Sequence, residues 1–264
     1  TIVGSEAGDG FDGEDDNTFI GFYAGGGAHS TTDSVAVGSY ALQAAATQGG
    51  TVAIGKDALK VLTSGARNLA IGYQALDSLT VGTDNVAIGY AAAGALTTGA
   101  SNYNIAIGSY ALSTADTSEE SNIAIGVNAM VNVDENGNTA NQNIAIGTNA
   151  LTGGALSGTL VDNIAIGFNA LDATGANAQT GTIAIGGSAL TALTSGTGNI
   201  AIGYQAADAL TTGENNTVLG YEALSTTGHL DANVAIGYRA LKIASGSDGS
   251  GWNTAVGYET GLAN

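Results

Sequence analysis

Acidic side chains near the start of the chain are the residues best suited to chemistry. Asp9, Asp12, Glu14 and Asp16 crowd one short segment. Carboxylate oxygens at this density bind hard cations, and Ca²⁺ takes six to eight oxygen ligands. We therefore expect either a weak calcium site at these four residues or an acidic loop in solvent. A second segment, 132–137, begins like a calcium-binding loop, but Asn143 stands where the final acidic ligand belongs.

The other reactive residue types do not combine into a catalytic centre. The two histidines, His29 and His229, are far apart in the sequence, and there is no cysteine. A nucleophile needs a base within hydrogen-bond reach, and a zinc site needs three or four ligands. We expect no enzymatic activity and no cofactor other than calcium.

The charge balance narrows the choice of partners. Asp and Glu number 23 against 5 Lys and Arg, which gives a formal net charge of −18. This excess repels a phosphate backbone, so we expect no nucleic acid partner. No apolar run reaches the length of a membrane span, and no signal peptide precedes the repeats, so we expect no membrane insertion in this segment. The sequence begins at Thr1 without Met, which we interpret as a processed or excised piece.

The elements that must position these residues are repeats. One motif, typified by Asn-Ile-Ala-Ile-Gly at 104–108, recurs along the whole chain. Its glycines are Gly4, Gly21, Gly38, Gly55, Gly72, Gly89, Gly108, Gly126, Gly147, Gly167, Gly186, Gly203, Gly220, Gly237 and Gly257. They are 17 to 21 residues apart, and the extra residues fall in one variable loop of each repeat. We predict a single β-solenoid domain over residues 1–264, with about fifteen coils of 17–21 residues.

Each repeat alternates with the period of a β-strand. In Ile105–Ile107 the two isoleucines share one face and Ala106 points the other way. The residues after the glycine, such as Tyr73–Leu76, predict a second short strand. A helix is disfavoured because a glycine in every unit costs about 1 kcal/mol at each helical site. The predicted class is all-β, with coils stacked in parallel.

Two further positions recur before the strand. The first is an asparagine that we expect to form a hydrogen-bonded ladder between coils. Its members include Asn68, Asn85, Asn104, Asn122, Asn143, Asn163, Asn199 and Asn216. The second is a glycine three residues earlier, which we expect to adopt positive φ as a turn residue. It occurs at Gly65, Gly82, Gly196 and Gly213.

The aliphatic residues of the strands form a stripe too large to leave in water. Another copy of the same chain is the simplest partner for it, so we expect a homo-oligomer. The matching motifs at the two ends of the chain also suggest end-to-end stacking of subunits, which would cover exposed sheet edges.

The motif Asn-x-Ala-Ile-Gly-x-x-Ala with glycine turns resembles the YadA-like head domain of trimeric autotransporter adhesins, over essentially the whole chain. The resemblance implies a left-handed parallel β-roll that forms a homotrimer, with small residues such as Ala106, Ala124 and Ala145 inside each roll. It implies a trimer interface at Ile105, Ile107, Ile123, Ile125, Ile144 and Ile146. The longer loops here depart from the family pattern. The implied function is an extracellular, adhesin-type surface fibre or filament that mediates attachment to a surface receptor or glycan.

The repeats are also compatible with other functions and other solenoid folds. Similar repeats occur in fibre proteins of tailed bacterial viruses, which would place the chain on a virion surface. An ice- or mineral-binding solenoid would need a flat array of threonines on one strand face, and the threonines here lie in loops. A left-handed hexapeptide helix would show an aliphatic residue every six positions around the coil, whereas this sequence shows one strong aliphatic cluster in each repeat. A column of tyrosines after the glycines, including Tyr73 and Tyr204, either stacks on itself or binds glycans.

Overall fold

The computed structural model describes residues 1–10, 16–27, 30–44, 46–47, 49–97, 101–114, 119–133, 140–153, 159–173, 179–226, 228–242 and 251–261. The chain divides into two compact units, Thr1–Asn128 and Ala129–Asn264, which we describe separately.

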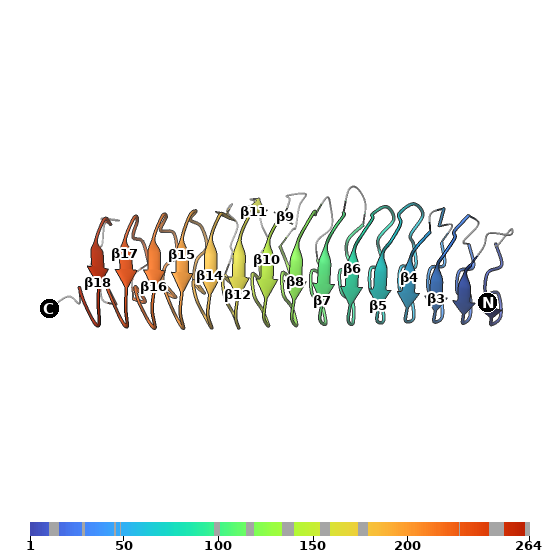
Figure 1. Cartoon of the computed structure of the whole chain (residues 1–264), viewed down its shortest axis with the longest axis horizontal. Helices are drawn as coiled ribbons and strands as arrows, with labels where there is room; N and C mark the ends of the chain where they lie inside the picture. The colour runs from blue at the N-terminus through green and yellow to red at the C-terminus, as the bar shows by residue number, and fades with distance from the viewer. Residues whose placement is uncertain are drawn as a thin grey trace. The chain divides into compact units, whose positions relative to one another are not determined.

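The first unit is built on one parallel sheet whose strands follow the order of the chain. Its strands are β1 (Ile2–Val3), β2 (Thr18–Ile20), β3 (Val35–Val37), β4 (Val52–Ile54), β5 (Leu69–Ile71), β6 (Val86–Ile88), β7 (Ile105–Ile107) and β8 (Ile123–Ile125). Figure 1 shows β3 to β8 side by side, one strand from each successive coil. The pairing is in register, so that Ile105 lies opposite Ile123 and Ala106 opposite Ala124.

The second unit repeats this arrangement and adds a small sheet. Its main strands are β10 (Ile144–Ile146), β12 (Ile164–Ile166), β14 (Ile183–Ile185), β15 (Ile200–Ile202), β16 (Thr217–Leu219), β17 (Val234–Ile236) and β18 (Thr254–Val256). Three two-residue strands from consecutive lengthened loops form the small sheet: β9 (Ala140–Asn141), β11 (Leu160–Val161) and β13 (Gln179–Thr180). Leu160 is fully buried there. This lengthened loop therefore adds a buried leucine to the core.

Each unit is thus a parallel β-solenoid, and the described residues contain no helix. The expectation of an all-β parallel solenoid is confirmed. The strands form where the sequence alternates β-branched residues with alanine, because a strand places alternate side chains on opposite faces.

The interior of each coil is narrow and filled by small or aliphatic side chains. In the coil of Gly72, the residues Ala70, Ala75, Leu76 and Leu79 are all fully buried. Alanine fits the central position of most strands because the interior is narrow, although Val218 fills the same position in β16. Leucines from the turn fill the remaining space.

One exception shows how tightly the interior is matched. Phe19 occupies the alanine position of β2 and is fully buried. Gly8 and Gly25 stand where other coils have a residue such as Leu42. A Cβ on Gly25 would lie 2.7 Å from the Phe19 ring, and one on Gly8 would lie 3.3 Å from it. The large side chain is accommodated because its neighbours have none.

The prediction of a second strand after the motif glycine is wrong. Residues 73–76 form a turn, with φ of 57° at Gln74 and 51° at Leu76. Such left-handed conformations cost about 1–2 kcal/mol for each non-glycine residue. The cost is offset because the Gln74 N–H donates to the Lys56 carbonyl at 3.1 Å and the Leu76 N–H donates to the Ala92 carbonyl at 3.0 Å. Burial of the Leu76 side chain contributes about 1.5–3 kcal/mol more.

The two recurrent glycines are required for different reasons. The motif glycine Gly72 has φ of 137°, and a Cβ there would lie 2.2 Å from the carbonyl oxygen of Gly89 in the next coil. The expectation of positive φ at the earlier glycine holds at Gly196 but is wrong at Gly65, Gly82 and Gly213. At Gly65 a Cβ would meet the Gly82 carbonyl oxygen at 2.1 Å, so close packing of coils excludes a side chain there.

Candidate interaction surfaces

The outward side of the main sheet carries two columns of aliphatic side chains in each unit. The central alanine of a strand, such as Ala106, Ala124 or Ala145, is fully buried, whereas the flanking residues are partly exposed. We call these outward residues the aliphatic face. In the first unit they are Val35, Val37, Val52, Ile54, Leu69, Ile71, Val86, Ile88, Ile105, Ile107, Ile123 and Ile125. In the second unit they are Ile144, Ile146, Ile164, Ile166, Ile183, Ile185, Ile200, Ile202, Leu219, Val234 and Ile236.

In-register pairing makes each column of the aliphatic face continuous within its unit. Ile164 lies opposite Ile183, and Ile166 lies opposite Ile185. Side chains in such columns cover each other along the column but leave their outer surface in solvent; 36% of Ile146 is exposed. A contiguous apolar surface of this kind marks an interaction site.

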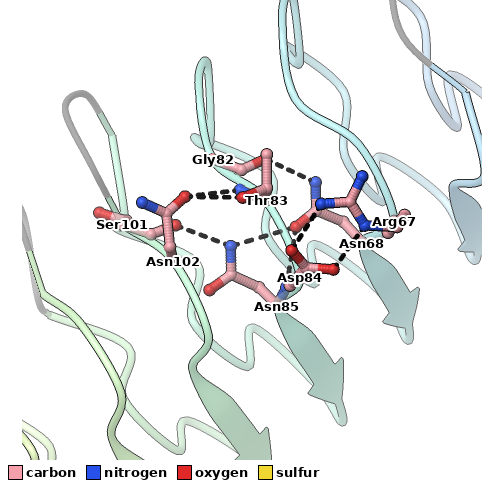
Figure 2. A network of polar contacts seen from close by, with 8 residues as sticks. All are labelled: Arg67, Asn68, Gly82, Thr83, Asp84, Asn85, Ser101 and Asn102. Atoms are coloured by element: carbon pink, nitrogen blue, oxygen red, sulfur yellow. Dashed lines mark hydrogen bonds and ion pairs between the residues drawn. The ribbon is translucent and has the colours of Figure 1, made fainter.

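The asparagine positions form a hydrogen-bonded ladder inside each unit. Figure 2 shows Asn85 between Asn68 and Ser101. The Asn85 backbone N–H and Nδ2 both donate to Asn68 Oδ1, at 3.0 and 3.1 Å, and Nδ2 also donates to the Ser101 carbonyl at 2.8 Å. Asn85 Oδ1 accepts in turn from the Asn104 N–H at 3.0 Å and from Asn104 Nδ2 at 3.1 Å.

The same contacts recur in other coils. In the first unit, Asn122 repeats them on Asn104. In the second unit, Asn163 donates to Asn143, and Asn216 donates to Asn199. A side-chain amide has two donor hydrogens and one acceptor oxygen with two lone pairs. Asn85 uses all of them within the protein, so this amide stabilises the coil and has no free group for a ligand.

Threonine interrupts the ladder and leaves polar atoms without partners. Thr51 and Thr182 occupy asparagine positions, and the Oγ1 atom of each is buried with no hydrogen-bond partner. The Thr182 N–H still donates to Asn163 Oδ1 at 3.0 Å. At Thr182 the backbone N–H therefore keeps its hydrogen bond to the ladder, whereas the side chain makes none.

Aromatic side chains stack in columns at the turn that follows the strand. In the second unit, ring centroids are 5.3 Å apart for Tyr204 and Tyr221, 5.5 Å for Tyr221 and Tyr238, and 5.1 Å for Tyr238 and Tyr258. The rings are nearly parallel, so each inner ring covers the faces of its neighbours. These inner tyrosines present ring edges to solvent, whereas a sugar stacks on an open face.

All five basic side chains of the protein form ion pairs. Arg67 makes a two-pronged contact with Asp84, with both N–O distances at 2.7 Å (Figure 2). The other four bases form two pairs, each on one carboxylate: Lys56 and Lys60 on Asp57, and Arg239 and Lys242 on Glu222. The sequence predicts a column of tyrosines that stack or bind glycans, and the structure shows stacked rings. The ion-pair arrangement was not predicted. The sequence does show that the five Lys and Arg residues fall in only two repeats, and this grouping could have indicated the ion pairs.

The ion pairs shift the pKa values of their acids. Hydrogen bonds from Lys242 and then Arg239 lower the pKa of Glu222 to about 2. Burial raises the pKa of Asp57, but hydrogen bonds from Lys56 and Lys60 outweigh burial and hold the pKa below its ordinary value. Burial raises the pKa of Asp77 and of Asp208, whose Oδ1 atom has no hydrogen-bond partner.

The remaining predicted sites fall partly outside the described residues. Asp12 and Glu14 lie outside them, whereas Asp9 and Asp16 are described and exposed. The calcium site therefore stays a prediction, and so does the segment 132–137, most of which lies outside as well. His29 is also outside, and His229 contacts the Thr212 hydroxyl at 2.5 Å. Within the described ranges, no group of three His, Asp or Glu residues could hold a metal ion.

Comparison with known proteins returned no relative. No family model, no curated protein and no solved structure matches this chain. Among the described residues there is also no helix with the length and hydropathy needed to cross a lipid bilayer.

Proposed function

We propose that this protein is a structural component of an extracellular fibre, assembled as a homotrimer through its aliphatic face and mediating attachment at a cell or virion surface. The observation that supports the proposal is the aliphatic face itself. Its continuous columns of partly exposed Ile, Val and Leu form an ordered apolar surface in the described part of each unit.

Burial of this face contributes free energy of the same order as the cost of association. Complete burial of an Ile or Val side chain contributes about 1.5–3 kcal/mol, and these side chains are already partly covered. Even about 0.5 kcal/mol from each residue of two such columns approaches the roughly 4–15 kcal/mol that association costs. Identical copies that associate through one surface form closed symmetric assemblies. We propose threefold symmetry and left-handed winding of the coils because the motif resembles that of adhesin heads.

The proposed role is structural instead of catalytic. The recurring buried amides are used in contacts between coils, as the four side-chain hydrogen bonds of Asn85 illustrate. The net charge of −18 keeps the assembly soluble and separates neighbouring fibres.

The proposal predicts that charge on the aliphatic face dissociates the assembly. A double variant, Ile107→Asp with Ile146→Asp, places one carboxylate on the face in each unit. The matched control, Gln74→Asp with Gln205→Asp, adds the same charge at turn positions whose left-handed φ suits Asp. Sedimentation velocity should show monomer for the first variant and trimer for the control. Trimer in both, or monomer in both, would refute the assignment of the interface.

A further inference from the structure

The basic residues of the first unit mark a site on the turn side of the coil. Lys56 and Lys60 share one carboxylate, Asp57, with Nζ–O distances of 2.5 and 3.2 Å. The Asp57 side chain is only 6% exposed, whereas those of Lys56 and Lys60 are 52% and 42% exposed. One ammonium is enough to neutralise one carboxylate. The second leaves a positive group facing solvent in a chain that is otherwise strongly acidic.

Nearby charges shift the pKa values of Lys56 and of the next acid. The hydrogen bond to Asp57 raises the pKa of Lys56, so the ammonium stays charged through neutral pH. Burial raises the pKa of Asp77, the next acid along the stack, and the charge of Lys60 opposes that shift.

The two lysines also lie between two separate tyrosine stacks. Tyr40 stacks on Tyr23 with centroids 5.8 Å apart, and Tyr73 stacks on Tyr90 at 5.5 Å. The coil of Gly55 lies between these two stacks and contributes no ring. Lys60 Nζ lies instead 5.4 Å from the Tyr40 centroid, and Lys56 Nζ lies 5.2 Å from the Tyr73 centroid. On each of these two tyrosines, the ammonium end of an exposed lysine therefore lies over the ring.

We propose that Tyr40, Lys56, Lys60 and Tyr73 bind an anionic carbohydrate, a pyranose that carries a carboxylate or a sulfate. The apolar face of the sugar ring packs against a tyrosine, and its acidic group replaces water on the ammonium groups. The inference rests on the proposed attachment function, for which it names the ligand class.

The overall charge favours a small, singly charged ligand over a polyanion. A net charge of −18 repels a nucleic acid or polyphosphate at long range, whereas one carboxylate or sulfate meets mainly the local ammonium groups. A single shallow site binds weakly. Three copies in a trimer raise the effective affinity for a surface that displays many such sugars.

The test titrates the intact protein with four probes, followed by NMR: 3′-sialyllactose, lactose 3′-sulfate, lactose and inorganic sulfate. Both acidic sugars should bind at least about tenfold more tightly than lactose or sulfate alone. If lactose bound as tightly as the acidic sugars, the lysines would not contribute to recognition. Equal binding of inorganic sulfate would reveal an anion site without sugar recognition. Either result overturns the proposal.

Variants locate the site. Lys60→Gln leaves Lys56 to neutralise Asp57, so the coil should remain folded, and Tyr73→Leu keeps an apolar side chain at the turn. Each should weaken binding of 3′-sialyllactose about tenfold or more. Arg67→Gln removes a base that Asp84 fully engages and should change affinity less than about twofold. Unchanged binding by Lys60→Gln would refute the site.

The molecular mass of the protein in the same samples tests the homotrimer independently of the carbohydrate site. A monomer that binds the acidic sugars would keep this site and refute the trimer. A trimer that binds neither sugar would keep the assembly and refute the site.

Discussion

Removal of one amide from the asparagine ladder should destabilise its coil far more than removal of a nearby surface amide. The variant Asn85→Ala deletes hydrogen bonds to Asn68, to the Ser101 carbonyl and from Asn104. The Ser101 carbonyl loses this donor, and the buried Asn104 N–H loses its acceptor. Each lost bond of this kind costs about 1–3 kcal/mol, so local unfolding should become easier by about 2–6 kcal/mol.

The matched control is Asn102→Ala. Asn102 Oδ1 accepts hydrogen bonds from the Thr83 N–H at 2.8 Å and from its hydroxyl at 3.1 Å, but the side chain is partly exposed, so water replaces it (Figure 2). The expected cost is below about 1 kcal/mol. Asn85→Thr should resemble Asn85→Ala, because the hydroxyl of the natural Thr182 finds no partner.

Hydrogen exchange followed by mass spectrometry is the suitable assay, since stacked repeats open locally and do not obey a single two-state transition. A loss of 2 kcal/mol corresponds to about 30-fold faster exchange of the Asn104 amide. If Asn85→Ala exchanges no faster than Asn102→Ala at that amide, the ladder does not stabilise the coil and the reasoning is refuted.

Three further substitutions test other parts of the structure. Thr182→Asn should restore the ladder above Asn163 and raise stability by about 0.5–1.5 kcal/mol, measured as slower exchange in that coil; faster exchange would contradict the prediction. Gly72→Ala should prevent folding of its coil, because the new Cβ would lie 2.2 Å from a backbone oxygen, whereas Gly187→Ala, with 3.4 Å to its nearest neighbour, should fold normally by circular dichroism. Asp208→Asn should raise the denaturation midpoint at pH 7, because the raised pKa of the folded acid means that ionisation opposes folding. That gain should vanish as the pH falls below the ordinary Asp pKa of 3.8, and a gain independent of pH would contradict the assignment.

The sequence predicts the strands well because their signal is local. Alternation in Ile105–Ile107 decides which side chains point inward, and repetition of the motif decides that equivalent strands pair in parallel. The turn after the glycine could not be predicted in the same way. Leu76 rarely adopts a left-handed conformation in isolation, and it does so here because hydrogen bonds to adjacent coils offset the strain.

Other features depend on contacts between coils. The compensation of Phe19 by Gly8 and Gly25 is visible as two coincident departures from the repeat, although only the structure shows that they touch. The earlier glycines, such as Gly65, are required by close approach of the neighbouring coil instead of by φ, a distinction that composition does not reveal. The site at Lys56 and Lys60 likewise needs the stacking of coils to place Tyr40 and Tyr73 beside it.

The central claim is that the aliphatic face joins three copies of the chain, and light scattering on the purified protein after gel filtration tests it most directly. The chain mass is 25.7 kDa, so the account predicts an assembly of about 77 kDa, three times that value, at micromolar concentration and independent of added chelator. A stable mass of 25.7 kDa across the same concentrations would contradict it, because the aliphatic face would then remain in solvent.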